Sequence, residues 1–239
     1  MTAMNEIPRY SSTPGKPSPA QITSSQKGTP IASNVAIANI NWQASTAVEN
    51  AVLLTTLVKC TFDGGTTPGG VQAGQVATFT GTTNIANKGS YRIVISDSTT
   101  ITITNKQRTN ATPDETGSPG TVTIYNPTFV TIFDSSTSNV YLEAINICTD
   151  SPQDVSVLFK LEQASPSATG ILTEITVPAL TGMNGQAPIN LLSMANFPSQ
   201  KISGGLVFPS GYKIIANAVI ESTYSINFIP IFGDYAVIS

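Results

Sequence analysis

From Ile31 onward, short stretches of β-branched and aliphatic residues alternate with turn residues, which recur about every 8–12 positions. The strands predicted from this pattern are 35–40, 51–58, 71–80, 91–95, 99–105, 121–125, 128–133, 140–147, 155–162, 171–177, 205–208, 212–219 and 225–232. Such spacing is typical of a β-sandwich or a barrel. Helical patterns are nearly absent, and residues 189–194 have room for one turn at most. We therefore predict an all-β fold, a β-sandwich of jelly-roll type.

Residues 1–30 differ from the rest of the chain. Pro8, Pro14, Pro17, Pro19 and Pro30 stand there among Ser, Thr, Lys and Gln, with few apolar residues. Because proline fixes φ and lacks a backbone donor, the stretch is predicted to be extended, without a helix or a central strand. We interpret it as an N-terminal arm that gains order on a partner. A disordered tail is the alternative.

A block over residues 59–125 has turn chemistry of its own. Its predicted tight turns are Asp63–Gly65, Pro68–Gly70, Asn87–Gly89 and Gly117–Gly120. Glycine and asparagine supply the positive φ angles that hairpin turns require. A loop insertion costs little closure entropy, so a small β module is compatible with a host domain. We predict an inserted β domain over 59–125, within a sandwich domain formed by 31–58 and 126–239.

Charged residues make up only 10% of the chain, against roughly 25% in typical soluble domains. Such a surface suits a protein whose flanks are covered by neighbours, although a Thr/Ser-rich secreted β domain has the same character. No segment has the clustered Lys and Arg of a nucleic-acid site. No apolar stretch resembles a signal peptide or a transmembrane helix, so no membrane partner is expected and assembly in a host cytoplasm is predicted. Cys60 and Cys148 are predicted to be buried free thiols, with a disulfide left open.

The sequence contains no histidine, which removes the commonest general base and the commonest metal ligand. Two carboxylate pairs remain, Asp150 with Asp154 and Asp114 with Glu115, both in turn-like segments. Carboxylates in such turns usually accept hydrogen bonds from local amides. We therefore predict no enzyme activity and no cofactor. A weak calcium site at Asp114 or Asp150 is a little more plausible than catalysis, because calcium prefers oxygen ligands, but neither residue has the spacing of a known calcium-binding loop.

Two regions carry a resemblance to tailed-bacteriophage virion proteins. The first is VQAGQVATFTGTTNIANKGSYRIVISDSTTITITN, which is similar to a small β module of phage head and tail proteins. The matching residues are Gly74, Val76, Phe79, Gly81, Asn87, Gly89, Tyr91, Ile101 and Asn105. In such a module Phe79, Tyr91 and the alternating isoleucines form one buried face. The second comprises NVYLEAINICTDSPQDVSVLFKL and FPSGYKIIANAVIESTYSINFIPIFGDY, which resemble strands and terminal hairpins of phage β-sandwich proteins.

The resemblance implies a non-enzymatic virion structural protein, namely a capsid decoration (cement) protein on the virion surface. Its expected partners are the major capsid protein, or another virion protein, and two further copies of itself in a trimer. Arg9, Tyr10, Lys16 and Lys27 of the arm are the candidate partner-binding residues. Many arms and faces acting together multiply modest contacts into firm attachment.

Two other hypotheses stay open. In a tail-associated adhesin, the inserted domain recognises a host glycan or another receptor, and Trp42, Tyr91 and residues 109–118 are the suspected binding residues. In a neck or tail adaptor, the same β architecture serves a junction present in few copies.

Overall fold

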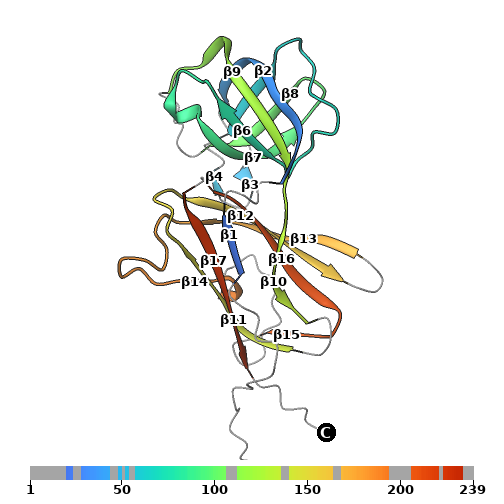
Figure 1. Ribbon diagram of the computed structural model, residues 1–239, viewed down its shortest axis with the longest axis vertical. Coiled ribbons are helices and arrows are strands. Elements are labelled where there is room, and N and C mark those ends of the chain that lie inside the picture. Colours follow the sequence, from blue (N-terminus) through green and yellow to red (C-terminus); the bar gives the residue numbers. More distant parts are fainter. Residues whose placement is uncertain are drawn as a thin grey trace, which may run out of the picture. The chain divides into compact units, whose positions relative to one another are not determined.

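A computed structural model of the chain (Figure 1) describes residues 20–23, 28–43, 48–49, 52–53, 57–105, 112–135, 140–163, 168–193, 206–220 and 223–233. These residues form strands and two single 3₁₀ turns, η2 (Ile85–Asn87) and η3 (Leu191–Ser193), with no α-helix among them. The predicted all-β class is confirmed. The chain divides into two compact units. Ser25–Thr128 form the barrel unit, and Met1–Ser24 with Phe129–Ser239 form the sheet unit.

Six antiparallel strands close the barrel unit in the order β2-β5-β8-β7-β6-β9 (Figure 1). They are β2 (Thr29–Gln43), β5 (Leu57–Phe62), β6 (Val76–Thr80), β7 (Gly89–Ser96), β8 (Thr100–Thr104) and β9 (Glu115–Asn126). Two further strands, β3 (Val48–Glu49) and β4 (Val52–Leu53), pair with each other and with no other strand among the described residues. Closure gives the barrel strands partners on both sides and removes the exposed edges that promote aggregation.

The barrel core follows from the two-residue period of its strands. Along β5, Val58, Cys60 and Phe62 are buried, and the residues between them are only partly buried. Successive side chains of a strand point to opposite faces, so these three face the interior. The core also contains Phe79 and Tyr91, whose ring centroids lie 5.9 Å apart. The predicted buried face with Phe79 and Tyr91 is therefore confirmed.

The predicted extent of the inserted domain needs correction. The sequence pattern places residues 31–58 in the sandwich, but β2 pairs with both β5 and β9 and is a barrel strand. The compact unit accordingly begins at Ser25 rather than at residue 59. The prediction fails because the pattern of β2 specifies a strand without specifying its partners.

The Gly117–Gly120 segment lies within β9 and not in the predicted hairpin loop. Ile37 of β2 is opposite Gly120, whereas Asn39 is opposite Thr116, so β9 has extra residues, a bulge, between these pairs. Positive φ angles at Gly117, Ser118 and Gly120 make this bulge. A Cβ on Gly120 would lie 2.4 Å from the Thr80 carbonyl oxygen, so the backbone approach there requires glycine.

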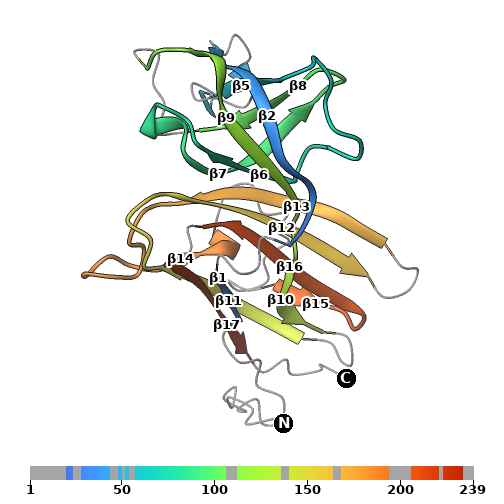
Figure 2. The ribbon, with the colours of Figure 1, turned by 45° about the horizontal axis from the view of Figure 1, so that its top comes forward.

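Two antiparallel sheets form the sheet unit, and Figure 2 shows them as two layers. One has the order β1-β17-β11-β14, with β15 also paired to β11, and the other has the order β10-β16-β12-β13. The strands are β1 (Ala20–Thr23), β10 (Val130–Asp134), β11 (Val140–Thr149), β12 (Val155–Gln163), β13 (Ala168–Val177), β14 (Ile189–Asn190), β15 (Leu206–Phe208), β16 (Tyr212–Val219) and β17 (Ser225–Gly233).

One hydrophobic core is shared by the two layers. Ile147 and Phe228 come from one sheet, Val157 and Phe159 come from the other, and all four are fully buried. The rings of Phe159 and Phe228 meet edge to face, with centroids 5.8 Å apart and an interplanar angle of 88°. The unit is therefore sandwich-like, with its core between the layers.

The predicted arm also ends earlier than expected. Ala20–Thr23 form β1, which pairs with β17, and Ile22 is completely buried in the core of the sheet unit. Thr29 and Pro30 already belong to β2. Proline is tolerated at the start of a strand, so Pro30 does not prevent this pairing. Residues 1–19 and 24–27 of the predicted arm lie outside the described residues.

Both cysteines are free thiols. Cys60 is buried in the barrel core, as predicted, whereas Cys148 of β11 is only partly buried. Partial burial raises the pKa of the Cys148 thiol above its usual value, which favours the neutral form.

Candidate functional site

The predicted partner-binding residues Arg9, Tyr10, Lys16 and Lys27 lie outside the described residues. Their part in binding stays a prediction. The remaining candidates from the sequence are the two carboxylate pairs, the aromatic residues Trp42 and Tyr91, and residues 109–118. The structure describes all of them except 109–111.

Asp150 and Asp154 are exposed and accept hydrogen bonds from backbone amides of two different segments. Asp150 Oδ1 accepts from the Ser225 amide at 2.6 Å, and Asp154 Oδ1 accepts from the Ala179 amide at 3.1 Å. Both carboxylates accept from backbone amides, as predicted, but these amides belong to distant segments, 75 and 25 residues along the chain, and not to the local turn. Each carboxylate links its turn to another part of the sheet unit, and its negative charge strengthens the hydrogen bond that makes the link.

Asp114 and Glu115 also differ in their partners. Asp114 Oδ1 accepts from the Trp42 amide at 2.8 Å and joins the start of β9 to β2. Glu115 Oε1 accepts from the Asn84 amide at 2.7 Å and from Asn87 Nδ2 at 2.8 Å. Glu115 is thus directed to the η2 turn, so the two adjacent carboxylates are held by different segments.

The η2 turn is a dense polar cluster beside the barrel core. Asn84 begins the turn, and its side chain accepts from the Ala86 amide at 3.0 Å. The Ala86 carbonyl oxygen accepts from Asn105 Nδ2 at 2.6 Å and from the Tyr91 hydroxyl at 3.2 Å. Asn87 is only 2% exposed. We call Asn84, Asn87, Tyr91, Asn105 and Glu115 the η2 cluster.

The predicted use of Tyr91 in glycan binding is wrong. Its side chain is buried against the barrel core, and its hydroxyl donates to backbone carbonyl groups of the η2 turn. Sugar stacking needs an exposed aromatic face. Trp42 is partly buried, and its indole nitrogen is buried without a hydrogen-bond partner.

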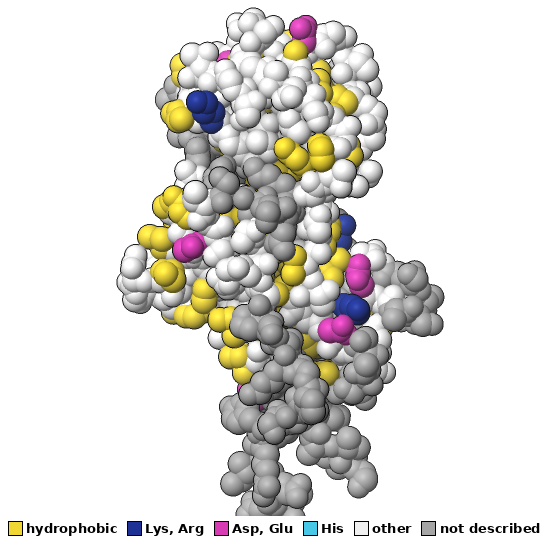
Figure 3. All heavy atoms as spheres, in the orientation of Figure 1, with side chains coloured by type: hydrophobic (Ala, Val, Ile, Leu, Met, Phe, Trp, Pro, Cys, Tyr) yellow, Lys and Arg dark blue, Asp and Glu magenta, His cyan; other side chains and the backbone are white. Residues whose placement is uncertain are grey.

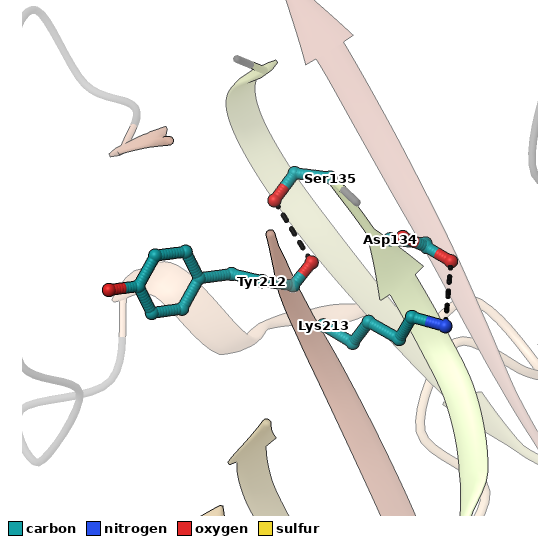
Figure 4. Close-up of polar contacts among 4 residues, drawn as sticks. All are labelled: Asp134, Ser135, Tyr212 and Lys213. Atoms are coloured by element: carbon teal, nitrogen blue, oxygen red, sulfur yellow. Dashed lines mark hydrogen bonds and ion pairs between the residues drawn. The ribbon is translucent and has the colours of Figure 1, made fainter. Parts of the chain in front are cut away.

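An ion pair and a hydrogen bond join β10 to the start of β16 (Figure 4). Lys213 Nζ lies 3.3 Å from Asp134 Oδ2, and the buried Ser135 hydroxyl donates to the Tyr212 carbonyl oxygen at 3.0 Å. Both side chains of the ion pair are substantially exposed, so water screens their attraction and its contribution to stability is small.

A polar turn links β7 to β8. Asp97 Oδ2 accepts from the Thr100 hydroxyl at 2.7 Å, and Asp97 Oδ1 accepts from the amides of Thr99 and Thr100 at 2.8 and 2.7 Å. These bonds, that of the Thr100 hydroxyl above all, hold the pKa of Asp97 well below its usual range.

The low pKa of Asp97 predicts a pH dependence of barrel stability. A depressed carboxyl pKa adds stability that is fully present above the unfolded-state pKa, about 3.9, and is lost as the pH falls toward the folded-state value. Asp97→Asn should therefore lower the free energy of unfolding at pH 7, and its difference from wild type should shrink below about pH 4. Urea titrations at several pH values measure this.

In Thr100→Val, NMR titration should show the Asp97 pKa moving upward; an unchanged pKa would contradict the assigned cause.

Among the described residues, no group of three or more Cys, Asp or Glu side chains is placed to hold a metal ion, and no helix is long and apolar enough to cross a membrane. No protein family model matches the chain, and no curated protein or solved structure matches it.

Sequence reasoning does not find the Asn87–Glu115 contact. It predicts a turn residue at Asn87 and a solvated carboxylate at Glu115, because the two are far apart in the chain. Their meeting depends on β9 lying beside β6, which precedes the η2 turn.

Proposed function

We propose that this chain is a non-enzymatic virion structural protein that decorates and stabilises a phage head, with the sheet unit as a jelly roll and the barrel as an inserted module. The strand pairing carries the proposal. The pairing runs inward from the two ends of the unit. The first strand, β1, pairs with the last, β17, and the second, β10, pairs with the next-to-last, β16. Further in, β11 pairs with β14 and β15, and β12 pairs with β13. This is the pairing of one long hairpin rolled into two sheets.

Jelly rolls are built in this way, and they are frequent in viral capsid proteins as well as in lectins and cupins. The barrel unit enters between β1 and β10, the first and second strands of the roll. An insertion between these two strands interrupts none of the four strand pairings of the long hairpin. The arrangement therefore supports a capsid-type domain that carries an additional module.

The surface chemistry agrees with a protein covered by neighbours. On the face that Figure 3 draws, charged side chains are few, several of them lie near one another at the right of the lower part, and most of the described surface is neutral. Partial burial between neighbouring subunits suits such a surface, because desolvating charged groups is costly and few have to be desolvated here. The resemblance to virion proteins also implies a trimer, which sedimentation of the purified chain distinguishes from a monomer.

Attachment to the particle is proposed to use the N-terminal arm. The truncation that tests this has to stop before β1, because Ile22 of β1 belongs to the core of the sheet unit. A chain lacking residues 1–19 should unfold at the same temperature as the full chain and should no longer sediment with particles stripped of the protein. Removing residues 1–23 should also destabilise the fold. Undiminished particle binding by the chain that lacks residues 1–19 would overturn the anchoring role of the arm.

A further inference from the structure

The charged residues of the sheet unit are divided unequally between its two layers. The strands of the layer formed by β10, β12, β13 and β16 contain Asp134, Lys160, Glu162, Glu174 and Lys213. Of these, Asp134, Lys213 and Glu162 form one row across the strands, on the face away from the core. The strands of the other layer contain a single charged residue, Glu143, at the bulge of β11. The outer face of that second layer therefore carries almost no charge.

The two-residue period of β17 and β11 identifies the side chains of this outer face. On β17, the residues that alternate with the buried Ile226 and Phe228 point away from the core. The outward residues of β11 lie opposite them in register. We call these outward residues the neutral face: Asn146, Cys148, Asn227, Ile229 and Ile231.

The neutral face exposes apolar side chains. Ile229 is 39% exposed, and Ile231 is partly exposed. The turn after β13 adjoins the face, since a Cβ on Gly182 would lie 2.6 Å from Cys148 Sγ, and the next residue, Met183, is 43% exposed. Within the described part of the sheet unit, Ile229 and Met183 are the exposed large hydrophobic residues, and both lie at this surface. Figure 3 shows hydrophobic side chains gathered over the area where Figure 1 draws β14 and β17. Contiguous exposed apolar surface is typical of a protein–protein interface.

We propose that the neutral face is the contact surface between copies of this chain, with the same face of each copy turned toward the axis of the oligomer. A surface that meets its own copy brings every charge near an identical charge, so a contact of this kind favours uncharged residues. The amides of Asn146 and Asn227 both donate and accept hydrogen bonds, and they bond to no other group among the described residues. Copies can therefore pair these amides with one another. A partner with a charged surface would instead fit the outer face of the opposite layer.

The contact is weak in solution. From strand rise and spacing, the neutral face measures roughly 30 Å along β17 and 15 Å across the strands, about half of the area that a standard interface buries on each partner. Association of the purified chain is therefore expected in the micromolar range, and copies held close together on a particle would associate more firmly. The inference rests on the trimer of the proposed function and assigns its interface, but it does not depend on attachment to a head.

Sedimentation of the purified full chain tests the proposal. Between about 1 and 500 µM, the wild-type chain should change from monomer to oligomer. In Ile229→Glu, the concentration of half-association should rise at least about tenfold, because identical charges meet at the axis. Mixing Ile229→Glu with Ile229→Lys should restore association, a result that misfolded variants could not give.

Two further variants locate the contact. Asn227→Asp adds a charge to the neutral face with little change in shape, and it should weaken association as Ile229→Glu does. Ile95→Glu is the matched control, because Ile95 is an exposed isoleucine on a strand of the barrel unit, and it should associate as wild type does. Equal association of wild type and Ile229→Glu would overturn the neutral face as the interface and leave the trimer standing. A wild-type chain that stays monomeric at about 500 µM would overturn both, whereas head attachment is decided separately by sedimentation with particles.

Discussion

Replacing Gly28 with alanine is expected to destabilise the barrel unit strongly. Gly28 has a φ of +99°, and a Cβ at this position would lie 1.7 Å from the Asn126 carbonyl oxygen and 2.9 Å from the Thr128 amide nitrogen. Both obstacles are backbone atoms at the end of β9, where β2 begins its pairing. No rotation of a side chain relieves such a clash.

The expected magnitude has two parts. The left-handed backbone costs a non-glycine residue about 1–3 kcal/mol, and the overpacking adds roughly 1–3 kcal/mol or more. Gly70→Ala is the matched control, because Gly70 has a φ of +83° with nothing within 4 Å of its added Cβ. Urea unfolding followed by Trp42 fluorescence measures both. Equal losses in the two variants would contradict the close approach of Gly28 to Asn126.

Truncating Phe228 to alanine should have the largest effect on the sheet unit. Phe228 of β17 is completely buried and meets the ring of Phe159 from the opposite sheet. Phe→Ala changes in a core typically cost about 3–5 kcal/mol, from lost burial and from the cavity that remains. The adjacent Ile229 is 39% exposed on the other face of β17, so Ile229→Ala should cost about 1 kcal/mol or less.

A double-mutant cycle extends this test across the layers. If Phe159 and Phe228 interact as the structure indicates, the single changes should be non-additive by roughly 0.5–1.5 kcal/mol in urea unfolding followed by far-UV circular dichroism. Additive losses, or equal losses at Phe228 and Ile229, would contradict a core shared by the two sheets.

Individual strands can be predicted from the sequence because their signals are local. The period-two pattern of β5 and the aliphatic character of β16 specify strands whatever lies beside them. Turn residues likewise indicate the hairpin between β7 and β8. The all-β class follows from such local features, and that part of the prediction is confirmed.

Strand partners and unit boundaries cannot be read in the same way. The 15-residue strand β2 pairs with β5 through its second half and with β9 from Thr29 to Ile40, through several register shifts. Those choices depend on contacts between distant residues, and hydrophobic period does not encode them. The η2 cluster escapes prediction for the same reason, since Asn87 and Glu115 meet only after β6 and β9 have paired.

The proposed function is tested most directly by locating the chain on the particle. Virions produced from the genome that encodes the chain would be labelled with gold-conjugated antibodies against it and imaged by electron microscopy. A decoration protein predicts label spread over the whole head, in copy numbers that scale with the capsid lattice. Label confined to the tail or neck, or absent from intact virions, would contradict a head decoration protein; a tail location would favour the adhesin or adaptor instead.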